Sequence, residues 1–123
     1  MAPIEEIEKV LRDDPRVVFA YLYGSASEGD RCRDVDIAVY LVDSQDAFAA
    51  AADLKLALGR SCGLAAETFD VRSLNGVGDL RYLRRVLSGR LLVDKDFDAR
   101  GDFLESYAAR YRESEGILDE AYG

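Results

Sequence analysis

The sequence contains no histidine, and this absence excludes several classes of chemistry. Ser-His-Asp catalysis, Cys-His catalysis and His-ligated zinc all require an imidazole. Only two cysteines are present, Cys32 and Cys62, and their spacing matches no zinc motif. We expect them to be the reduced thiols of a cytoplasmic protein. Carboxylates are therefore the main candidates for catalysis.

The sequence also has no recognisable targeting segment, and its acidic residues outnumber its basic ones. Residues 1–6 carry no basic stretch followed by an apolar core, so no signal peptide is expected. No apolar run approaches the length of a membrane span, which is about 20 residues. The 16 Lys and Arg against 24 Asp and Glu give a net charge of −8. This charge disfavours nucleic acid as a partner but is compatible with a single triphosphate carried with Mg²⁺.

The length and composition predict one globular domain that spans residues 1–123. The chain is 49% hydrophobic and 33% charged, which is typical of a folded protein with a core. Helices are expected at 3–12, 45–58, 79–87 and 97–122, and strands at 17–23, 34–42, 65–71 and 90–94. Ser44 is the expected N-cap of the second helix and Gly59 its end, and residues 25–28 could form one helical turn. The order predicts an α/β (α+β) fold, with helices packed against a small mixed sheet.

The most informative motif joins the first two expected strands. Gly24-Ser25 follows the first strand, and a glycine there allows backbone N–H groups to approach a phosphate, to which the serine hydroxyl adds a donor. Asp34 and Asp36 open the second strand and point to the same side, because strand residues alternate between faces. Two adjacent carboxylates repel unless a cation lies between them, and Mg²⁺ prefers oxygen ligands. The pattern predicts chemistry on a nucleoside triphosphate.

A third carboxylate lies on the next expected strand. Asp70 stands among apolar residues, and it projects near Asp34 and Asp36 if the two strands are neighbours. Three carboxylates suit a two-metal site in which the third activates an acceptor hydroxyl. Glu67 is expected on the opposite face, as a solvated charge.

Each of these features also has a purely structural interpretation. Asp34 and Asp36 could be ordinary acids at a strand boundary, Asp70 could be an exposed acid of an edge strand, and Gly24-Ser25 could be only a tight turn. The basic cluster of the sequence could be a solvated helix face, or it could contact an acidic partner or ATP. It consists of Arg81, Arg84, Arg85 and Arg90.

Taken together, these motifs resemble the minimal nucleotidyltransferase (MNT) family of the DNA polymerase β-like superfamily. The resemblance covers roughly residues 15–95, the expected core, and leaves residues 97–122 as a helical tail. It rests on three features. The glycine turn precedes the first two carboxylates, a later strand carries the third carboxylate, and a helix, a glycine and a strand close the core. These segments are Gly24-Ser25, Asp34-Val35-Asp36 with Ile37-Ala38-Val39, Glu67-Thr68-Phe69-Asp70-Val71, and residues 81–94.

The resemblance implies Mg²⁺-dependent transfer of a nucleoside monophosphate to a hydroxyl. Asp34, Asp36 and Asp70 would bind the metals, and Asp70 would also assist deprotonation of the acceptor. Gly24 and Ser25 would bind the β- and γ-phosphates. Many MNT proteins, the MntA-type antitoxins, are encoded beside a HEPN-domain RNase toxin and transfer AMP from ATP to its tyrosine; the tail at 97–122 would contact such a toxin.

Two departures from the family pattern keep other functions open. Eight residues separate Ser25 from Asp34, where the family usually has ten, and Glu28 stands where a basic residue is common. A carboxylate at that position repels a triphosphate. The alternatives are a catalytically silent antitoxin that acts by binding alone, and a nucleotidyltransferase that acts on a small hydroxyl compound.

Overall fold

The computed structural model describes residues 3–24, 34–43 and 46–122, with side chains through residue 115. The elements of this part of the chain follow the predicted alternation of helices and strands, apart from one added 3₁₀ turn. They are α1 (Ile4–Asp13), β1 (Val17–Tyr23), β2 (Val35–Leu41), α2 (Ala47–Cys62), η2 (Ala66–Thr68), β3 (Phe69–Ser73), α3 (Leu80–Leu87), β4 (Arg90–Asp94) and α4 (Phe97–Tyr122).

The strands form one mixed sheet in the order β3-β2-β1-β4. β1 pairs antiparallel with both β2 and β4, and β2 pairs parallel with β3. β1 and β2 are almost entirely buried, as expected for strands that are covered on both faces. The polar residue of β2 is Asp36, near its start.

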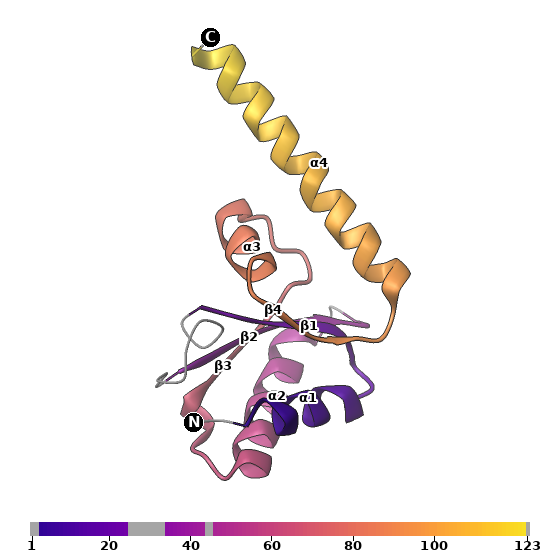
Figure 1. Cartoon of the computed structure of the whole chain (residues 1–123), viewed down its shortest axis with the longest axis vertical. Helices are drawn as coiled ribbons and strands as arrows, with labels where there is room; N and C mark the ends of the chain where they lie inside the picture. Colours follow the sequence, from indigo (N-terminus) through magenta and orange to yellow (C-terminus); the bar gives the residue numbers. More distant parts are fainter. Residues whose placement is uncertain (1–2, 25–33, 44–45, 123) are drawn as a thin grey trace.

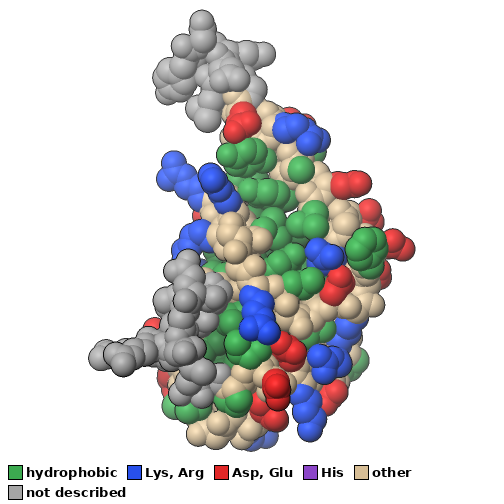
Figure 2. Space-filling view, in the orientation of Figure 1, with side chains coloured by type: hydrophobic (Ala, Val, Ile, Leu, Met, Phe, Trp, Pro, Cys, Tyr) green, Lys and Arg blue, Asp and Glu red, His purple; other side chains and the backbone are tan. Residues whose placement is uncertain are grey.

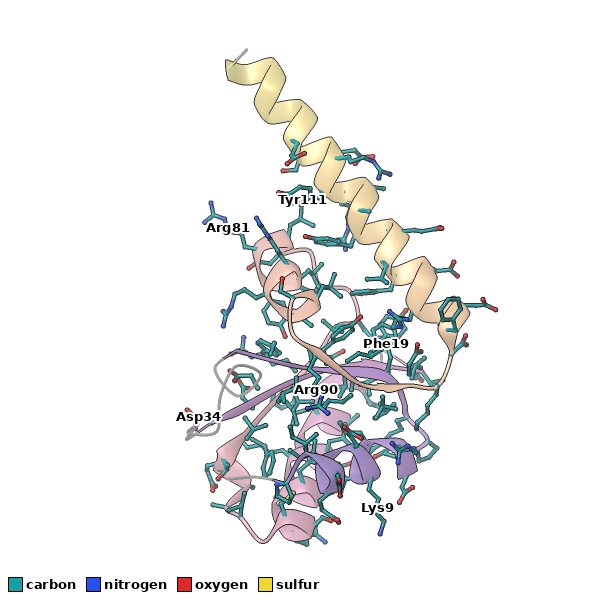
Figure 3. All side chains as sticks on the ribbon, viewed as in Figure 1. Lys9, Phe19, Asp34, Arg81, Arg90 and Tyr111 are labelled. Atoms are coloured by element: carbon teal, nitrogen blue, oxygen red, sulfur yellow. The ribbon has the colours of Figure 1, made fainter. Side chains whose placement is uncertain are left out.

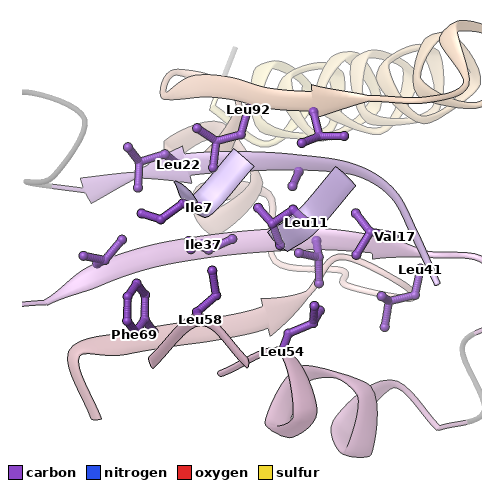
Figure 4. Close-up of a cluster of buried hydrophobic side chains, with 14 of the residues drawn as sticks. Ile7, Leu11, Val17, Leu22, Ile37, Leu41, Leu54, Leu58, Phe69 and Leu92 are labelled. Carbon is purple, nitrogen blue, oxygen red and sulfur yellow. The ribbon is translucent and has the colours of Figure 1, made fainter. Parts of the chain in front are cut away.

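Helices cover the two faces of the sheet in separate pairs, with α1 and α2 on one face and α3 and α4 on the other (Figure 1). The first face carries the larger cluster of buried side chains (Figure 4). Ile7 and Leu11 from α1 and Leu54 and Leu58 from α2 pack there against the sheet. Each such side chain stabilises the fold by about 1.5–3 kcal/mol on burial.

The second face is more aromatic and positions the helices that flank the candidate site. Phe19 stacks on Tyr40 with ring centroids 4.9 Å apart, and Phe103 from α4 contacts both rings edge-on. Leu83 and Val86 attach α3 to the same cluster. α4 continues beyond α3, so its C-terminal half projects from the body of the protein (Figure 1). Among the described residues, α4 included, no helix is both long and apolar enough to cross a membrane.

The predicted bounds of the second helix are wrong at both ends. α2 begins at Ala47, with Asp46 as its N-cap residue, and Ser44 lies outside the described residues. The helix continues through Gly59 to Cys62 and ends at Gly63, which has φ +68°. Gly59 is needed for packing, because a Cβ there would lie 3.0 Å from the Leu64 carbonyl oxygen. Its lack of a side chain lets the chain reverse closely against the helix.

The third strand also differs from the prediction, since its first residues form a 3₁₀ turn. Ala66–Thr68 makes this turn after α2, and the strand runs from Phe69 to Ser73. β3 extends beyond Val71 because its parallel register with β2 continues to the pair Val39–Ser73. Glu67 therefore lies in a turn and not on a strand face.

Candidate active site

The candidate site lies at one end of the sheet, where β1 ends and β2 and β3 begin. Asp36 on β2 is the register partner of Tyr23 on β1 and of Asp70 on β3. Register partners project to the same face of a sheet. Ala38, two residues after Asp36, lies in the aromatic cluster, so the two carboxylates project to the face that carries α3.

Asp34 lies next to this pair, immediately before β2 (Figure 3). The pKa of the Asp36 carboxyl is raised, first by burial and then by the negative charges of Asp70 and Asp34. The Arg85 and Arg72 guanidinium groups act in the opposite direction. The three carboxylates predicted from the sequence are therefore brought into one electrostatic environment, with excess negative charge at Asp36.

Gly24 packs directly against Asp36. The residue has φ +72°, and a Cβ at this position would lie 2.5 Å from Asp36 Oδ2. Only glycine fits, because a side chain would be strained by the backbone and would also displace the carboxylate. The turn after β1 thus contacts the carboxylates of β2. Ser25, Glu28 and the turn expected at 25–28 lie outside the described residues.

Two arginines that the sequence analysis did not assign to the site lie beside the carboxylates. Arg72 Nε donates to Asp70 Oδ2 at 3.2 Å. Arg85 is on α3, and its guanidinium carbon lies 5.9 Å from the centroid of the Tyr23 ring. Arg72 could have been found from its position two residues after Asp70, on the same strand face. Arg85 belonged to the basic cluster, but its place at the site depends on how α3 packs.

Two tyrosines complete the surroundings of the carboxylates. The hydroxyl oxygens of Tyr23 and Tyr82 lie 3.3 Å apart and share a hydrogen bond. Burial is the main cause of the raised pKa of each phenol, and the charge of Asp36 raises both further. Both phenols are therefore neutral hydrogen-bonding groups at physiological pH. The Arg72 guanidinium carbon lies 6.0 Å from the centroid of the Tyr82 ring.

The donor set suits a divalent cation with oxygen ligands, although the carboxylates are not gathered around one point. Within the described ranges, no three Asp, Glu or Cys side chains are already arranged to hold a metal. Asp70 is directed to Arg72 by their ion pair. Burial is the main cause of the raised pKa of Asp36, and the charges of Asp70 and Asp34, which Mg²⁺ would offset, raise it further. The residues therefore fit Mg²⁺ by chemistry and charge.

Comparison with known proteins places the chain in a family. The model of the polymerase β nucleotidyltransferase family matches residues 5–98. No match was found among curated proteins.

Several solved structures share the fold. A mutant of the toxin–antitoxin MntA-HpeT is 25% identical, with 100% of both chains covered and a TM-score of 0.71. A toxin–antitoxin with AMP-PNP is 24% identical over 98% of each chain, with a TM-score of 0.69. A protein from Shewanella oneidensis is 19% identical over 97% of this chain and 92% of its own, with a TM-score of 0.59. Because the family model covers most of the chain, the protein belongs to the polymerase β family and is a nucleotidyltransferase.

Proposed function

We propose that the protein transfers AMP from ATP, with Mg²⁺, to a tyrosine hydroxyl of a cognate HEPN-domain RNase toxin, and so acts as its antitoxin. The observation that carries this proposal is the pairing of Asp36 with Asp70 beside Gly24. Two carboxylates and a glycine turn are then available to one metal-bound triphosphate. The AMP-PNP in one toxin–antitoxin of the same fold makes ATP the first nucleotide to test.

Each residue has a distinct role in this proposal. Asp34 and Asp36 would hold Mg²⁺, and Asp70 would hold a second Mg²⁺ and assist deprotonation of the acceptor hydroxyl. The backbone of Gly24 and the hydroxyl of Ser25 bind the β- and γ-phosphates. Arg72 and Arg85 offset negative charge on the same side of the sheet, as their effect on the pKa of Asp36 indicates.

The reaction is a displacement at the α-phosphorus of ATP. The acceptor oxygen forms a bond to this phosphorus, the bond to the β-phosphate oxygen breaks, and pyrophosphate leaves on the opposite side. Asp70 removes the proton from the attacking oxygen, which requires its release from Arg72. Mg²⁺ held by these carboxylates would supply charge stabilisation for the attacking and leaving oxygens.

The antitoxin role is supported by the likeness to MntA-HpeT along the full length of the chain. The C-terminal half of α4 also projects from the body, which leaves an extended helix available to a partner (Figure 1). A domain of this size has little surface with which to hold an acceptor by itself, so an acceptor presented by another protein fits the architecture.

A transfer assay tests the proposal. The protein is incubated with α-labelled ATP, Mg²⁺ and the product of the neighbouring gene, and the D34A/D36A double variant is the control. We expect label on a tyrosine of the partner with the wild type and none with the control.

Other outcomes would assign one of the alternatives. A stable complex without label would indicate an antitoxin that acts by binding alone, and Glu28 would then be the first residue to vary. Label on a small hydroxyl compound, with no complex, would indicate an enzyme of small-molecule metabolism.

A further inference from the structure

The outer side of α3 carries a group of arginines that the proposed chemistry does not fully use. Arg81, Arg84 and Arg85 lie away from Leu83 and Val86, which face the core. Figure 2 shows basic side chains gathered at the position of α3, and Figure 3 shows Arg81 directed outward from this helix. We call Arg81 and Arg84, with the groove beside them, the α3 surface.

The charge of the α3 surface is not balanced within the described part of the chain. There, neither Arg81 nor Arg84 forms an ion pair with a carboxylate, whereas Arg16, Arg72 and Arg100 each do. The chain as a whole has a net charge of −8. Guanidinium groups without an ion pair favour an acidic partner, because a carboxylate can pair with them.

A groove between α3 and α4 lies next to these arginines. It has a volume of about 320 Å³ and is lined by Leu80, Arg81, Arg84, Tyr111, Ser114 and Glu115. Leu80 and Tyr111 provide apolar contact area, while Arg81 and Arg84 provide hydrogen-bond donors that suit carboxylates. Glu115 lines the same groove and contributes one negative charge. This mixture suits a short polypeptide segment with acidic and apolar side chains.

The α3 surface is connected to the candidate active site through one turn of helix. Arg81 and Arg85 are four residues apart, so they are neighbours on the helix. Arg85 lies over the ring of Tyr23, the register partner of Asp36. A polypeptide that presents a hydroxyl to Asp36 and Asp70 can therefore lie along α3 and reach Arg81 and Arg84.

We propose that the α3 surface docks an acidic segment of the polypeptide that carries the acceptor hydroxyl. The identity of the acceptor rests on the proposed function, but the charge preference of the surface does not. Nucleic acid is disfavoured as the occupant, because phosphate binding usually requires several basic residues along a track. The α3 surface offers two unpaired arginines and includes a carboxylate.

Binding to defined polymers tests the docking proposal. The probes are a fluorescent Glu-Tyr copolymer and a Lys-Tyr copolymer, and their binding to the full chain is followed by anisotropy. R81E/R84E is compared with K9E/R60E, which makes the same charge change at exposed positions of α1 and α2. We expect R81E/R84E to weaken binding of the Glu-Tyr copolymer by about tenfold, and K9E/R60E by less than about twofold. Binding of the Lys-Tyr copolymer should be the same in the wild type and in R81E/R84E.

Two results would overturn the docking proposal. One is equal weakening of Glu-Tyr copolymer binding by R81E/R84E and K9E/R60E, which would mean that binding depends only on the net charge of the protein. The other is a single-stranded RNA oligomer that displaces the Glu-Tyr copolymer at lower concentration, with the same dependence on Arg81 and Arg84. The neutral variant R81Q/R84Q, with its unfolding midpoint measured, separates lost docking from misfolding.

A transfer readout keeps this proposal separate from the proposed function. If R81E/R84E alone loses binding, and neither copolymer nor the product of the neighbouring gene accepts label from ATP, docking stands and tyrosine transfer is contradicted. If the Glu-Tyr copolymer is labelled equally by wild type and R81E/R84E below saturation, docking is contradicted and transfer stands.

Discussion

Asp36 and Asp70 are register partners on the parallel strands β2 and β3, which sets two carboxylates side by side on one face of the sheet. The substitution D36N keeps the shape of the side chain and removes its charge. We expect it to lower AMP transfer by more than about 100-fold, because it removes a proposed metal ligand. The label incorporated per minute checks this, and D102N, on the exposed surface of α4, is the control. Normal transfer by D36N would contradict the site.

The same substitution tests the charge of the site through stability. The folded-state pKa of Asp36 is raised above its ordinary value of 3.8 by burial and by Asp70. The wild type therefore loses stability as pH rises from this value through the folded pKa, and the loss persists above it. D36N does not titrate there, so its unfolding midpoint should exceed that of the wild type by a few degrees at neutral pH. The difference should vanish at about pH 3.5.

Gly24 is predicted to contribute to stability and to be required for activity. In G24A the added Cβ would lie 2.5 Å from Asp36 Oδ2, at a residue with φ +72°. G76A is a matched control, because Gly76 has φ +73° but open space around its Cα. Both variants should lose about 1–2 kcal/mol of unfolding free energy from backbone strain. Only G24A should also lose transfer activity. Equal activity in the two variants would contradict a role of the Gly24 turn in positioning Asp36.

The sequence predicted the elements most reliably where hydrophobic periodicity is long or strand boundaries are sharp. The bounds predicted for β1, β4 and α4 agree with the structure. The nearness of Asp70 to Asp36 was also predicted, because it needs only that two neighbouring strands align. The start of β3 was missed, since Ala66–Thr68 has no pattern that separates a strand from a turn. Arg85 was left open between a solvated helix face and a contact with ATP or an acidic partner, because its place beside Tyr23 depends on how α3 packs on the sheet.

Arg72 is expected to assist nucleotide binding more than folding. Its ion pair with Asp70 is exposed, so R72Q should change the unfolding free energy by less than about 1 kcal/mol. The loss of one positive charge beside three carboxylates should weaken binding of Mg-ATP by about tenfold. Calorimetric titration with Mg-ATP measures this, with R60Q on α2 as the control. An unchanged affinity of R72Q for Mg-ATP would show that Arg72 pairs with Asp70 but does not assist nucleotide binding.

Asn75 is predicted to be the main polar contributor to the stability of the β2–β3 edge. Its side-chain amide donates to the Leu41 carbonyl oxygen and its oxygen accepts from the Leu41 amide, each at 2.9 Å. Leu41 is 1% exposed, so N75A leaves buried backbone groups without these partners. We expect N75A to lower the unfolding free energy by about 1–3 kcal/mol in denaturant titration. S88A, which removes an exposed hydrogen bond to Arg84, should cost less than about 0.5 kcal/mol.

The variant N75D separates the two hydrogen bonds that Asn75 makes to Leu41. Its carboxylate can still accept from the Leu41 amide and the Ser73 hydroxyl, but it cannot donate to the Leu41 carbonyl oxygen. We therefore expect N75D to be less stable than the wild type at neutral pH and to recover part of the loss when acid protonates the carboxyl. A variant N75A as stable as S88A would show that water replaces the side chain at this edge.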